Sequence, residues 1–286
     1  PGKKGTTPRV ESDYPILSSG LFNGMSTGAP ILIRFENNNT RSEAYTSQRD
    51  IPRPGHADFT GHVKFGGFED YRGGGHFSGR LTTCLVAAGV IAKIVLSHVL
   101  NTDISINAEI LEIGGEKDLE AGLEKAIQAK DSIGGIVECR IKGLPVGLGE
   151  PFFDSVESVL AHAVFSIPAI KGIEFGKGFA AAKMFGIEHN DAILDNSGKT
   201  LTNNAGGIVG GISNGNDLEF RVVVKPTSST PKIQKSYNWD SDEVEEFSIK
   251  GRHDLCIALR VPVVLEAAAA IALADLALIR MAYHVR

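Results

Sequence analysis

The sequence has little cysteine and no excess of positive charge. Cys84, Cys139 and Cys256 are odd in number and far apart, so they predict neither a disulfide framework nor a zinc knuckle. Reduced thiols of this kind are typical of a cytoplasmic protein. The formal net charge of −5 excludes a broad basic face, and we therefore do not expect nucleic acid as a partner.

The chain also lacks an initiator methionine, a targeting segment and an internal linker. Its 286 residues show no repeat or break in composition, so we expect a single domain over residues 1–286. The apolar run 261–279 has nearly the length of a membrane span. Glu266 and Asp275 would be costly in lipid, so the run predicts a buried core helix and no membrane partner.

Hydrophobic periodicity predicts both strands and helices. The expected strands are 29–37, 106–113, 134–144 and 218–226, and the expected helices are 80–99, 117–130, 150–167 and 261–284. The polar stretch 227–246 predicts a surface excursion. Residues 80–99 and the last helix have almost no polar face, so both need covering on more than one side. This favours an α+β fold, a β-α-β sandwich with long helices layered between two antiparallel sheets.

Four polar clusters carry residues suited to chemistry. They are RPGHAD (53–58) with the following RGGGHFSGR (72–80), NNAGGIVGGISNG (203–215), KPTSS (225–229) and GRHD (251–254). The three glycines permit close approach of another body, and Arg72 and Arg80 flank them, so the stretch is either an ordinary surface loop or an anion-binding loop. KPTSS places a cation and three hydroxyls where Pro226 ends a strand, which suits a phosphate as well as a simple turn.

Other features of these clusters leave alternatives open. His56 and Asp58 are an acid/base pair, or metal ligands together with His62, although no further spaced ligand completes a metal set. Asp254 stands before the last helix, where a helix cap is the simpler interpretation. Residues 176–181, GKGFAA, fit a dinucleotide-binding pattern, but no βαβ unit surrounds them.

Taken together, the four clusters resemble the chorismate synthase family, in order and spacing, along the whole chain. The resemblance implies a lyase of the shikimate pathway of aromatic amino acid biosynthesis. It converts 5-enolpyruvylshikimate 3-phosphate to chorismate by anti-1,4-elimination of phosphate and requires reduced FMN (FMNH2). The resemblance also implies a β-α-β sandwich assembled as a homotetramer.

The resemblance assigns roles to individual residues. His56 matches a catalytic histidine that protonates the departing phosphate, and Asp254 an aspartate that helps take a proton through flavin N5. Arg53 matches an arginine that faces the anionic substrate. The implied flavin-binding residues are His76, Phe77, Ser78, Pro168, Ala169, Gly210, Lys225, Pro226, Thr227, Ser228, Ser229 and Arg252. No metal is implied.

The chain departs from the family pattern in three places. Many members read Arg-Ser-Ser at His76-Phe77-Ser78, so we expect a member of the HFSGR-type variant, and Pro168 stands where asparagine is common. The family's opening segment, with a Gly-Glu-Ser-His-Gly motif that carries a second catalytic histidine, is not in this sequence.

Three hypotheses follow from the residues and the resemblance. The first is an active chorismate synthase, and the second is a truncated form that binds flavin without turnover. The unrelated third is a metal-dependent hydrolase that uses His56, Asp58 and His62. The sequence leaves open whether the protein reduces its own flavin with NADPH or depends on a separate flavin reductase.

Overall fold

The computed structural model describes residues 4–7, 12–37, 49–249 and 253–283. Its central sheet has four antiparallel strands in the order β5-β6-β10-β7. These strands are β5 (Ser105–Ile113), β6 (Gly135–Lys142), β10 (Leu218–Val224) and β7 (Ile170–Phe175). In the central register Val222 of β10 lies between Val137 of β6 and Ile173 of β7.

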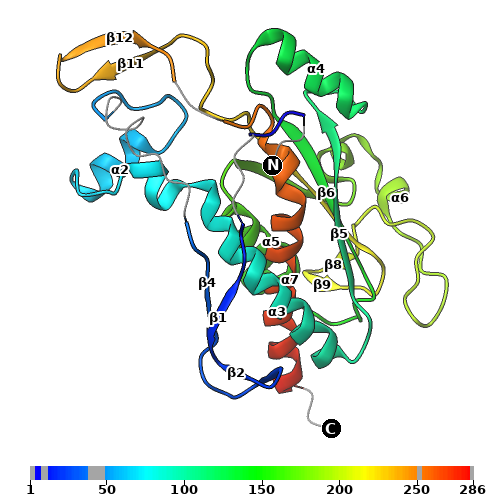
Figure 1. The fold of residues 1–286 in the computed structure, drawn as a ribbon. Helices are drawn as coiled ribbons and strands as arrows, with labels where there is room; N and C mark the ends of the chain where they lie inside the picture. Colours follow the sequence, from blue (N-terminus) through cyan, green and yellow to red (C-terminus); the bar gives the residue numbers. More distant parts are fainter. Residues whose placement is uncertain (1–3, 8–11, 38–48, 250–252, 284–286) are drawn as a thin grey trace.

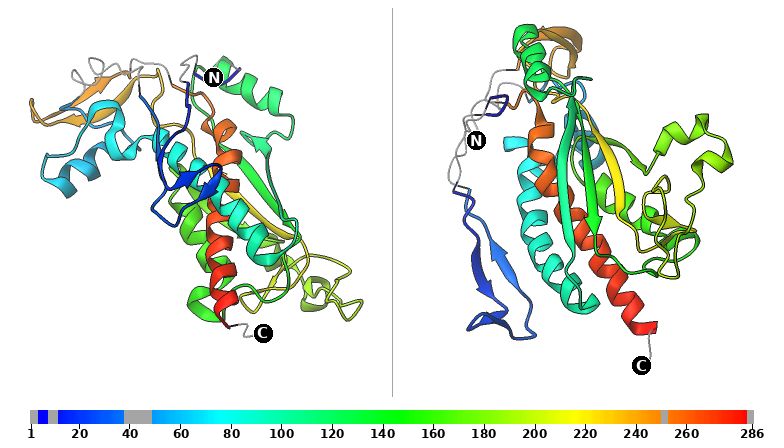
Figure 2. Two further views of the ribbon diagram at one scale, coloured as in Figure 1. Left: turned by 60° about the horizontal axis from the view of Figure 1, so that its bottom comes forward. Right: turned by 90° about the vertical axis from the view of Figure 1, so that its right-hand side faces the viewer.

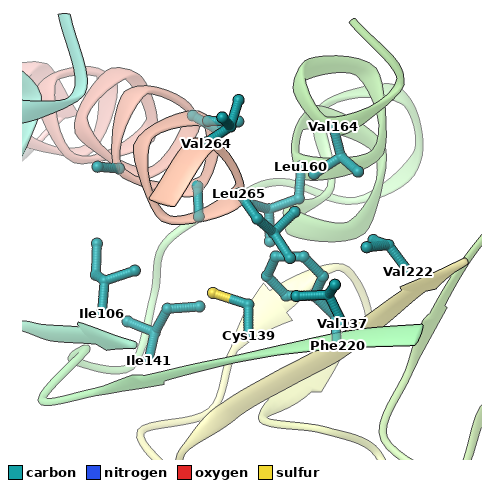
Figure 3. Close-up of a cluster of buried hydrophobic side chains, with 14 of the residues drawn as sticks. Ile106, Val137, Cys139, Ile141, Leu160, Val164, Phe220, Val222, Val264 and Leu265 are labelled. Atoms are coloured by element: carbon teal, nitrogen blue, oxygen red, sulfur yellow. The ribbon is translucent and has the colours of Figure 1, made fainter. Parts of the chain in front are cut away.

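Three helices form the layer against one face of this sheet. They are α3 (Thr82–Leu100), α5 (Val156–Phe165) and α7 (Val261–Tyr283). The helix α7 packs on β5 and β6, α5 packs beside α7, and α3 packs on α7 (Figure 1). Alternate residues of β10 point into this layer, as predicted: Leu218, Phe220, Val222 and Val224 are all buried. Figure 3 shows Phe220 and Val137 of the sheet facing Leu160 of α5 and Leu265 of α7.

A second, smaller β-structure stands on the far side of α3. Strands β1 (Ile16–Ser19) and β4 (Leu32–Arg34) pair as a ribbon that ends in the short hairpin of β2 (Leu21–Phe22) and β3 (Met25–Ser26). The ribbon lies on the side of α3 away from the central sheet (Figure 2). The predicted α+β architecture, with helices between antiparallel sheets, is therefore confirmed.

The remaining elements are short. The helices are α2 (Asp58–Phe65), α4 (Leu119–Ala129) and α6 (Gly186–His189). The strands are β8 (Ile208–Val209), β9 (Ile212–Ser213), β11 (Gln234–Asn238) and β12 (Glu243–Phe247). The 3-10 turns are η1 (Arg72–Phe77), η2 (Gly79–Leu81), η3 (Phe152–Asp154), η4 (Gly178–Lys183) and η5 (Ile257–Arg260).

Some sequence expectations differ from the structure. The helix expected over 150–167 begins only at Val156, because Phe152 has φ +66° and Ser155 Oγ caps the helix by accepting the Ser158 N–H at 3.1 Å. The strand expected over 29–37 is limited to three residues in β4. The sequence also predicted that α3 would be covered on more than one side. In this chain only one face of α3 packs on α7, and Val90 and Ile94 on its surface are 56 % and 66 % exposed.

Two helical segments have the length and composition to cross a membrane. They are Gly79–Leu100 and Ile257–Tyr283, and the second is mostly buried within the fold. The prediction that 261–279 forms a buried core helix is therefore confirmed. The polar excursion at 227–246 contains the β11–β12 hairpin, which the sequence did not predict.

Gly89 sets how closely α3 approaches α7. A Cβ at this position would lie 2.4 Å from the Cβ and 2.5 Å from the Cα of Ala267. We expect Gly89→Ala to lower the free energy of unfolding by about 1–3 kcal/mol through overpacking, although alanine is the better helix former by about 1 kcal/mol.

Denaturant unfolding followed by circular dichroism measures this effect. Gly186→Ala is the matched control, because a Cβ there meets nothing within 4 Å, and it should be neutral or slightly stabilising. If Gly89→Ala were as stable as the wild type, the two helices would have to lie further apart than they do in this structure.

Candidate active site

The segment Arg53–Asp58 forms a turn in front of α2 in which three polar side chains contact one another. Arg53 donates from Nε to Asp58 Oδ2 at 2.7 Å and from Nη2 to Oδ1 at 2.8 Å. The Nδ1 atom of His56 lies 2.6 Å from Asp58 Oδ1. The side chains of Arg53, Asp58 and His56 are only 10 %, 27 % and 19 % exposed. The turn therefore holds a cation, a carboxylate and an imidazole in a partly dry environment.

The protonation of Asp58 determines which nitrogen of His56 is reactive. Burial alone would raise the pKa of Asp58, but hydrogen bonds from Arg53 and His56, helped by the charge of Arg53, hold it well below its usual value. An ionised carboxylate only accepts hydrogen bonds, so Nδ1 of His56 carries a hydrogen and donates it to Asp58. The other nitrogen, Nε2, is then the ring atom that can give or receive a proton.

The Lys225–Ser229 segment docks onto this turn. Lys225 Nζ donates to the Gly55 carbonyl at 2.6 Å and to Ser228 Oγ at 2.9 Å, and the Ser228 hydroxyl donates to the same carbonyl at 2.7 Å. The buried hydroxyl of Ser229 accepts from Arg53 Nη1 at 3.3 Å. Two clusters that are 170 residues apart in sequence therefore form one site.

Further predicted residues surround Lys225. The Ala169 carbonyl, which follows Pro168, accepts the Lys225 N–H at 2.9 Å, and Ala169 has φ +73°. Within the described part of the chain, the buried Thr227 Oγ1 has no hydrogen-bond partner. Burial, and the charge of a second lysine nearby, lower the pKa of Lys225. The strand β10 ends at Val224, two residues before Pro226, so the strand expected over 218–226 is slightly shorter than predicted.

The glycine-rich stretch forms another wall of the site. It folds as the 3-10 turn η1, and its Phe77 ring packs on α2 at Gly61, where a Cβ would lie 2.6 Å from the ring. Ser78 accepts the Arg80 N–H at 3.3 Å, while the neighbouring His76 is exposed. The stretch therefore contacts α2 through Phe77, which lines the same cleft as Arg53 and Asp58.

The two arginines that flank the glycines both have carboxylate partners. Arg72 pairs with Asp70 at 2.8 Å, and Arg80 pairs with Asp13 at 2.9 Å. Neither guanidinium donates a hydrogen bond to a described residue of the Arg53–Asp58 turn. Among the described residues, Arg53 and Lys225 are therefore the cations that the hydrogen bonds place at the turn.

A cleft of about 50 Å³ opens where these segments meet; its lining residues are Arg49, Arg53, Ala57, Asp58, Glu69, Asp70, Tyr71, Gly74, Phe77 and Trp239. A larger hollow of about 370 Å³ lies over β6, β7 and β10, and includes Asn203 and Asn204. The arginine at this hollow, Arg221, pairs with Glu174 at 3.1 Å. The smaller cleft is the candidate active site, because Arg53 and Asp58 line it.

The GRHD cluster approaches the same site through His253. Burial and the nearby charges of Arg53 and His56 lower the pKa of His253, and Asp254 opposes the shift. Asp254 itself accepts two hydrogen bonds from Arg260, at 2.7 and 3.0 Å. It caps no helix, since Cys256 precedes η5, so the helix-cap alternative was wrong. The predicted Arg252 lies outside the described residues.

Gly210 is not brought to this cleft. It lies in the turn between β8 and β9, next to the Leu218 end of β10, whereas Lys225 follows the opposite end. A strand of 7 residues separates the two ends by about 20 Å. A Cβ at Gly210 would meet nothing within 4 Å, so the position is open to solvent in a single chain.

The metal-site alternative is not supported by the geometry. His62 lies 3.1 Å from Glu69 and stacks on Trp239, whereas His56 and Asp58 contact Arg53. No group of three His, Cys, Asp or Glu residues suited to a metal occurs in the part of the chain that the structure describes. The dinucleotide pattern at 176–181 follows an antiparallel strand and forms a 3-10 turn, so it is not part of a βαβ unit.

Sequence reasoning missed several residues around the cleft. Trp239 and Glu69 line it, and Arg49 lies over the ring of Tyr71 at 5.1 Å. The partner of Asp254, Arg260, was also missed. Trp239 carried a usable signal, because it is the only tryptophan and lies in a polar stretch. The other residues have no local pattern that distinguishes them.

Comparison with known proteins identifies the family that the chain is similar to. A family model described as chorismate synthase matches residues 1–278. The chain is 70 % identical to the chorismate synthase of Chitinophaga pinensis over 278 residues, covering 97 % of this chain and 82 % of that protein. It is 44 % identical to a chorismate synthase of Dehalococcoides mccartyi over 302 residues, covering 96 % and 83 %. A crystal structure of chorismate synthase superposes with a TM-score of 0.68 at 25 % identity, covering 91 % of this chain and 77 % of that one.

The ionised Asp58 should stabilise the fold in a pH-dependent way. Its pKa in the folded protein is below the ordinary value of 3.8, so its contribution is complete at neutral pH and declines as the pH falls below that value. We expect Asp58→Asn to lower the free energy of unfolding by about 2 kcal/mol at pH 7, and the difference from wild type to narrow progressively as the pH falls below about 4.

Urea unfolding at several pH values measures the difference. Asp70→Asn is the control, because the Asp70–Arg72 pair is exposed and should contribute little to stability at any pH. A loss on Asp58→Asn that is the same at all pH values would contradict an ionised Asp58.

Proposed function

This chain belongs to the chorismate synthase family, and on that premise we propose that the Arg53–Asp58 turn and the Lys225–Ser229 segment form its active site. The family consists of lyases of the shikimate pathway, which convert 5-enolpyruvylshikimate 3-phosphate to chorismate by anti-1,4-elimination of phosphate. One observation carries the proposal. Arg53 contacts His56 within the turn, and Lys225 donates to the Gly55 carbonyl of the same turn.

We assign the departing phosphate to Arg53 and His56. Asp58 occupies the Nε and Nη2 side of the Arg53 guanidinium and so orients it, which leaves an N–H of Nη1 to donate to a phosphate oxygen. His56 Nε2 would give the proton to the leaving phosphate, since Nδ1 is held by Asp58 at 2.6 Å. Asp58 acts on both groups: it orients the guanidinium and selects the reactive ring nitrogen.

The family needs a flavin, and the residues around Lys225 fit one that carries a phosphate. Lys225, Ser228 and Ser229 supply a cation and two hydroxyls, and the buried Thr227 hydroxyl has no partner among the described residues. Pro168, Ala169 and Pro226 would flank the group on one side, and His76, Phe77 and Ser78 on the other. We propose that the flavin is reduced FMN, which when bound supplies electron density to the substrate ring as phosphate leaves. Arg252 stays a proposed contact.

Asp254 is the proposed acceptor of the proton that leaves the substrate ring. Its carboxylate is held by Arg260 and by the Thr7 N–H at 2.7 Å. A carboxylate has about four lone-pair directions, so one remains for the proton. Its neighbour His253 lies close enough to Arg53 for their charges to interact, which supports the proposal that Asp254 serves the same site.

We propose that the single domain of residues 1–286 assembles as a homotetramer. The chain exposes 17086 Å², whereas a compact monomer of its mass would expose roughly 12,000 Å². The exposed apolar residues on the ribbon and on α3 include Leu17, Phe22, Leu32, Val90 and Ile94. Such surface is typical of a subunit interface. Assembly would also let Gly210 reach the flavin of a neighbouring copy, which a single chain does not allow.

We place the protein in the cytoplasm, since Cys84, Cys139 and Cys256 are free thiols and two of them are buried. The reductant for the flavin is either NADPH acting on this protein or a separate flavin reductase. An anaerobic assay with NADPH as the sole reductant distinguishes the two.

His56→Ala in the full-length protein tests the proposed general acid. Turnover of 5-enolpyruvylshikimate 3-phosphate should fall by about 10²–10⁴, the usual contribution of one positioned acid. Affinities for flavin and substrate should change much less, because Arg53 and Lys225 remain. A folded variant with turnover within a few-fold of wild type would end the assignment. A wild-type protein that binds flavin without turnover would support the truncated, inactive alternative.

Lys225→Met tests the flavin site separately. Losing a charge-assisted hydrogen bond of about 1.5–3 kcal/mol should weaken FMN binding by about 10–100-fold in a flavin fluorescence titration with substrate present. Lys235→Met is the matched control, because Lys235 is exposed and pairs with Glu246 on the hairpin. If the full-length protein bound no FMN at all, the cofactor assignment would be wrong; if Lys225→Met bound it normally, only the location would be wrong.

A further inference from the structure

The β11–β12 hairpin is attached to the chain just before Arg53. The Trp239 N–H donates to the Asp50 carbonyl at 2.9 Å, and the Ser236 hydroxyl donates to the Pro52 carbonyl at 2.5 Å. Both acceptors lie within three residues of the arginine. The hairpin therefore fixes the main chain that leads into the catalytic turn.

The indole ring of Trp239 contacts the other end of the same turn. It stacks on His62 with ring centroids 4.5 Å apart and an interplanar angle of 25°, and it faces Phe59 at 6.4 Å. Both rings belong to α2, whose first residue is Asp58. His62 is held in turn by Glu69, at 3.1 Å from Nδ1.

A two-stranded hairpin is marginally stable by itself in water, so its position depends on these attachments. Its other surface is open: Val244 is 67 % exposed and Tyr237 42 %. The large aromatic surface of Trp239 is the main apolar contact between this hairpin and α2 that the structure provides. Without the ring, the hairpin would keep its hydrogen bonds to the Asp50 and Pro52 carbonyls before the turn. It would lose the ring contacts with α2 after the turn.

We propose that Trp239 is a positioning residue for the elimination. It joins the segment before Arg53 to α2, the helix that begins with Asp58. Arg53 and Asp58 form the ion pair that orients His56, so the distance between the two ends of the turn sets the geometry of all three groups. A misplacement of about 1 Å can reduce a rate about 10²-fold without changing any reacting group. This inference rests on the proposed function, because the effect is read as turnover.

The test compares ring variants of the full-length protein. Trp239→Ala should lower kcat by about 10–100-fold with KM for 5-enolpyruvylshikimate 3-phosphate changed less than about threefold, because the anion-binding side chains remain but are misaligned. Trp239→Phe keeps an aromatic face for His62 and should recover most of the lost kcat. Val244→Ala, on the open side of the same hairpin, is the matched control and should behave as wild type.

A second readout does not depend on activity. Because the 286-residue chain has one tryptophan, the emission of this chain reports this contact alone. His62→Ala should shift the emission of Trp239 to longer wavelength as the ring is exposed, and should lower kcat in the same direction as Trp239→Ala. This variant also keeps the test open if Trp239→Ala does not fold.

Three results would overturn the proposal: a folded Trp239→Ala protein with wild-type kcat, equal losses for Trp239→Ala and Trp239→Phe, or a raised KM with unchanged kcat, which would make Trp239 a substrate contact. If the Trp239→Ala protein does not fold, a His62→Ala protein with wild-type kcat and wild-type tryptophan emission would also overturn the proposal. An inactive wild-type protein would instead contradict the proposed function, so the two failures are distinguishable.

Discussion

The carboxylate of Asp58 is the group on which the rest of the site depends. It accepts two side-chain hydrogen bonds from Arg53 and one from His56, all between 2.6 and 2.8 Å. Without it, the Arg53 guanidinium would lie in a partly buried turn with Lys225 nearby and without its carboxylate partner. The same carboxylate leaves Nε2 of His56 as the only ring atom available for proton transfer.

The fold places this carboxylate where it is stabilised. Asp58 is the first residue of α2, where the helix dipole favours a negative charge. The four-stranded sheet supplies the opposite wall, because β10 ends at Val224 and delivers Lys225 and Ser228 to the Gly55 carbonyl. The sheet and its helical layer thus act as a rigid frame, and the chemistry lies on loops at one end of it.

Much of this frame could be predicted from local sequence patterns. The alternation of Phe220 and Val222 with polar residues identified β10 and its buried face, and the apolar run after residue 260 identified α7. The start of α5 was missed because a Ser155 cap and the backbone of Phe152 override a proline signal. The hairpin of β11 and β12 was missed because its residues are polar and show weak alternation.

The site was predictable in a different way. The resemblance supplied the roles of Arg53, His56 and Lys225, and the structure brings these residues together. The partners that hold them could not be predicted, because contacts such as that of Arg53 with Ser229 join positions far apart in the chain and leave no local pattern. The roles of all these residues stay predictions: the structure pairs Asp254 with Arg260 and holds Gly210 away from the cleft, and Arg252 lies outside the described residues.

The central claim is that Asp58 presents Arg53 and His56 together to one phosphate. A crystal structure of the full-length protein with FMN and 5-enolpyruvylshikimate 3-phosphate tests it most directly. The account predicts the substrate phosphate within about 3 Å of both the Arg53 guanidinium and His56 Nε2, with Nδ1 still bonded to Asp58. A phosphate bound away from Arg53, or a His56 ring turned so that Nε2 contacts Asp58, would contradict it.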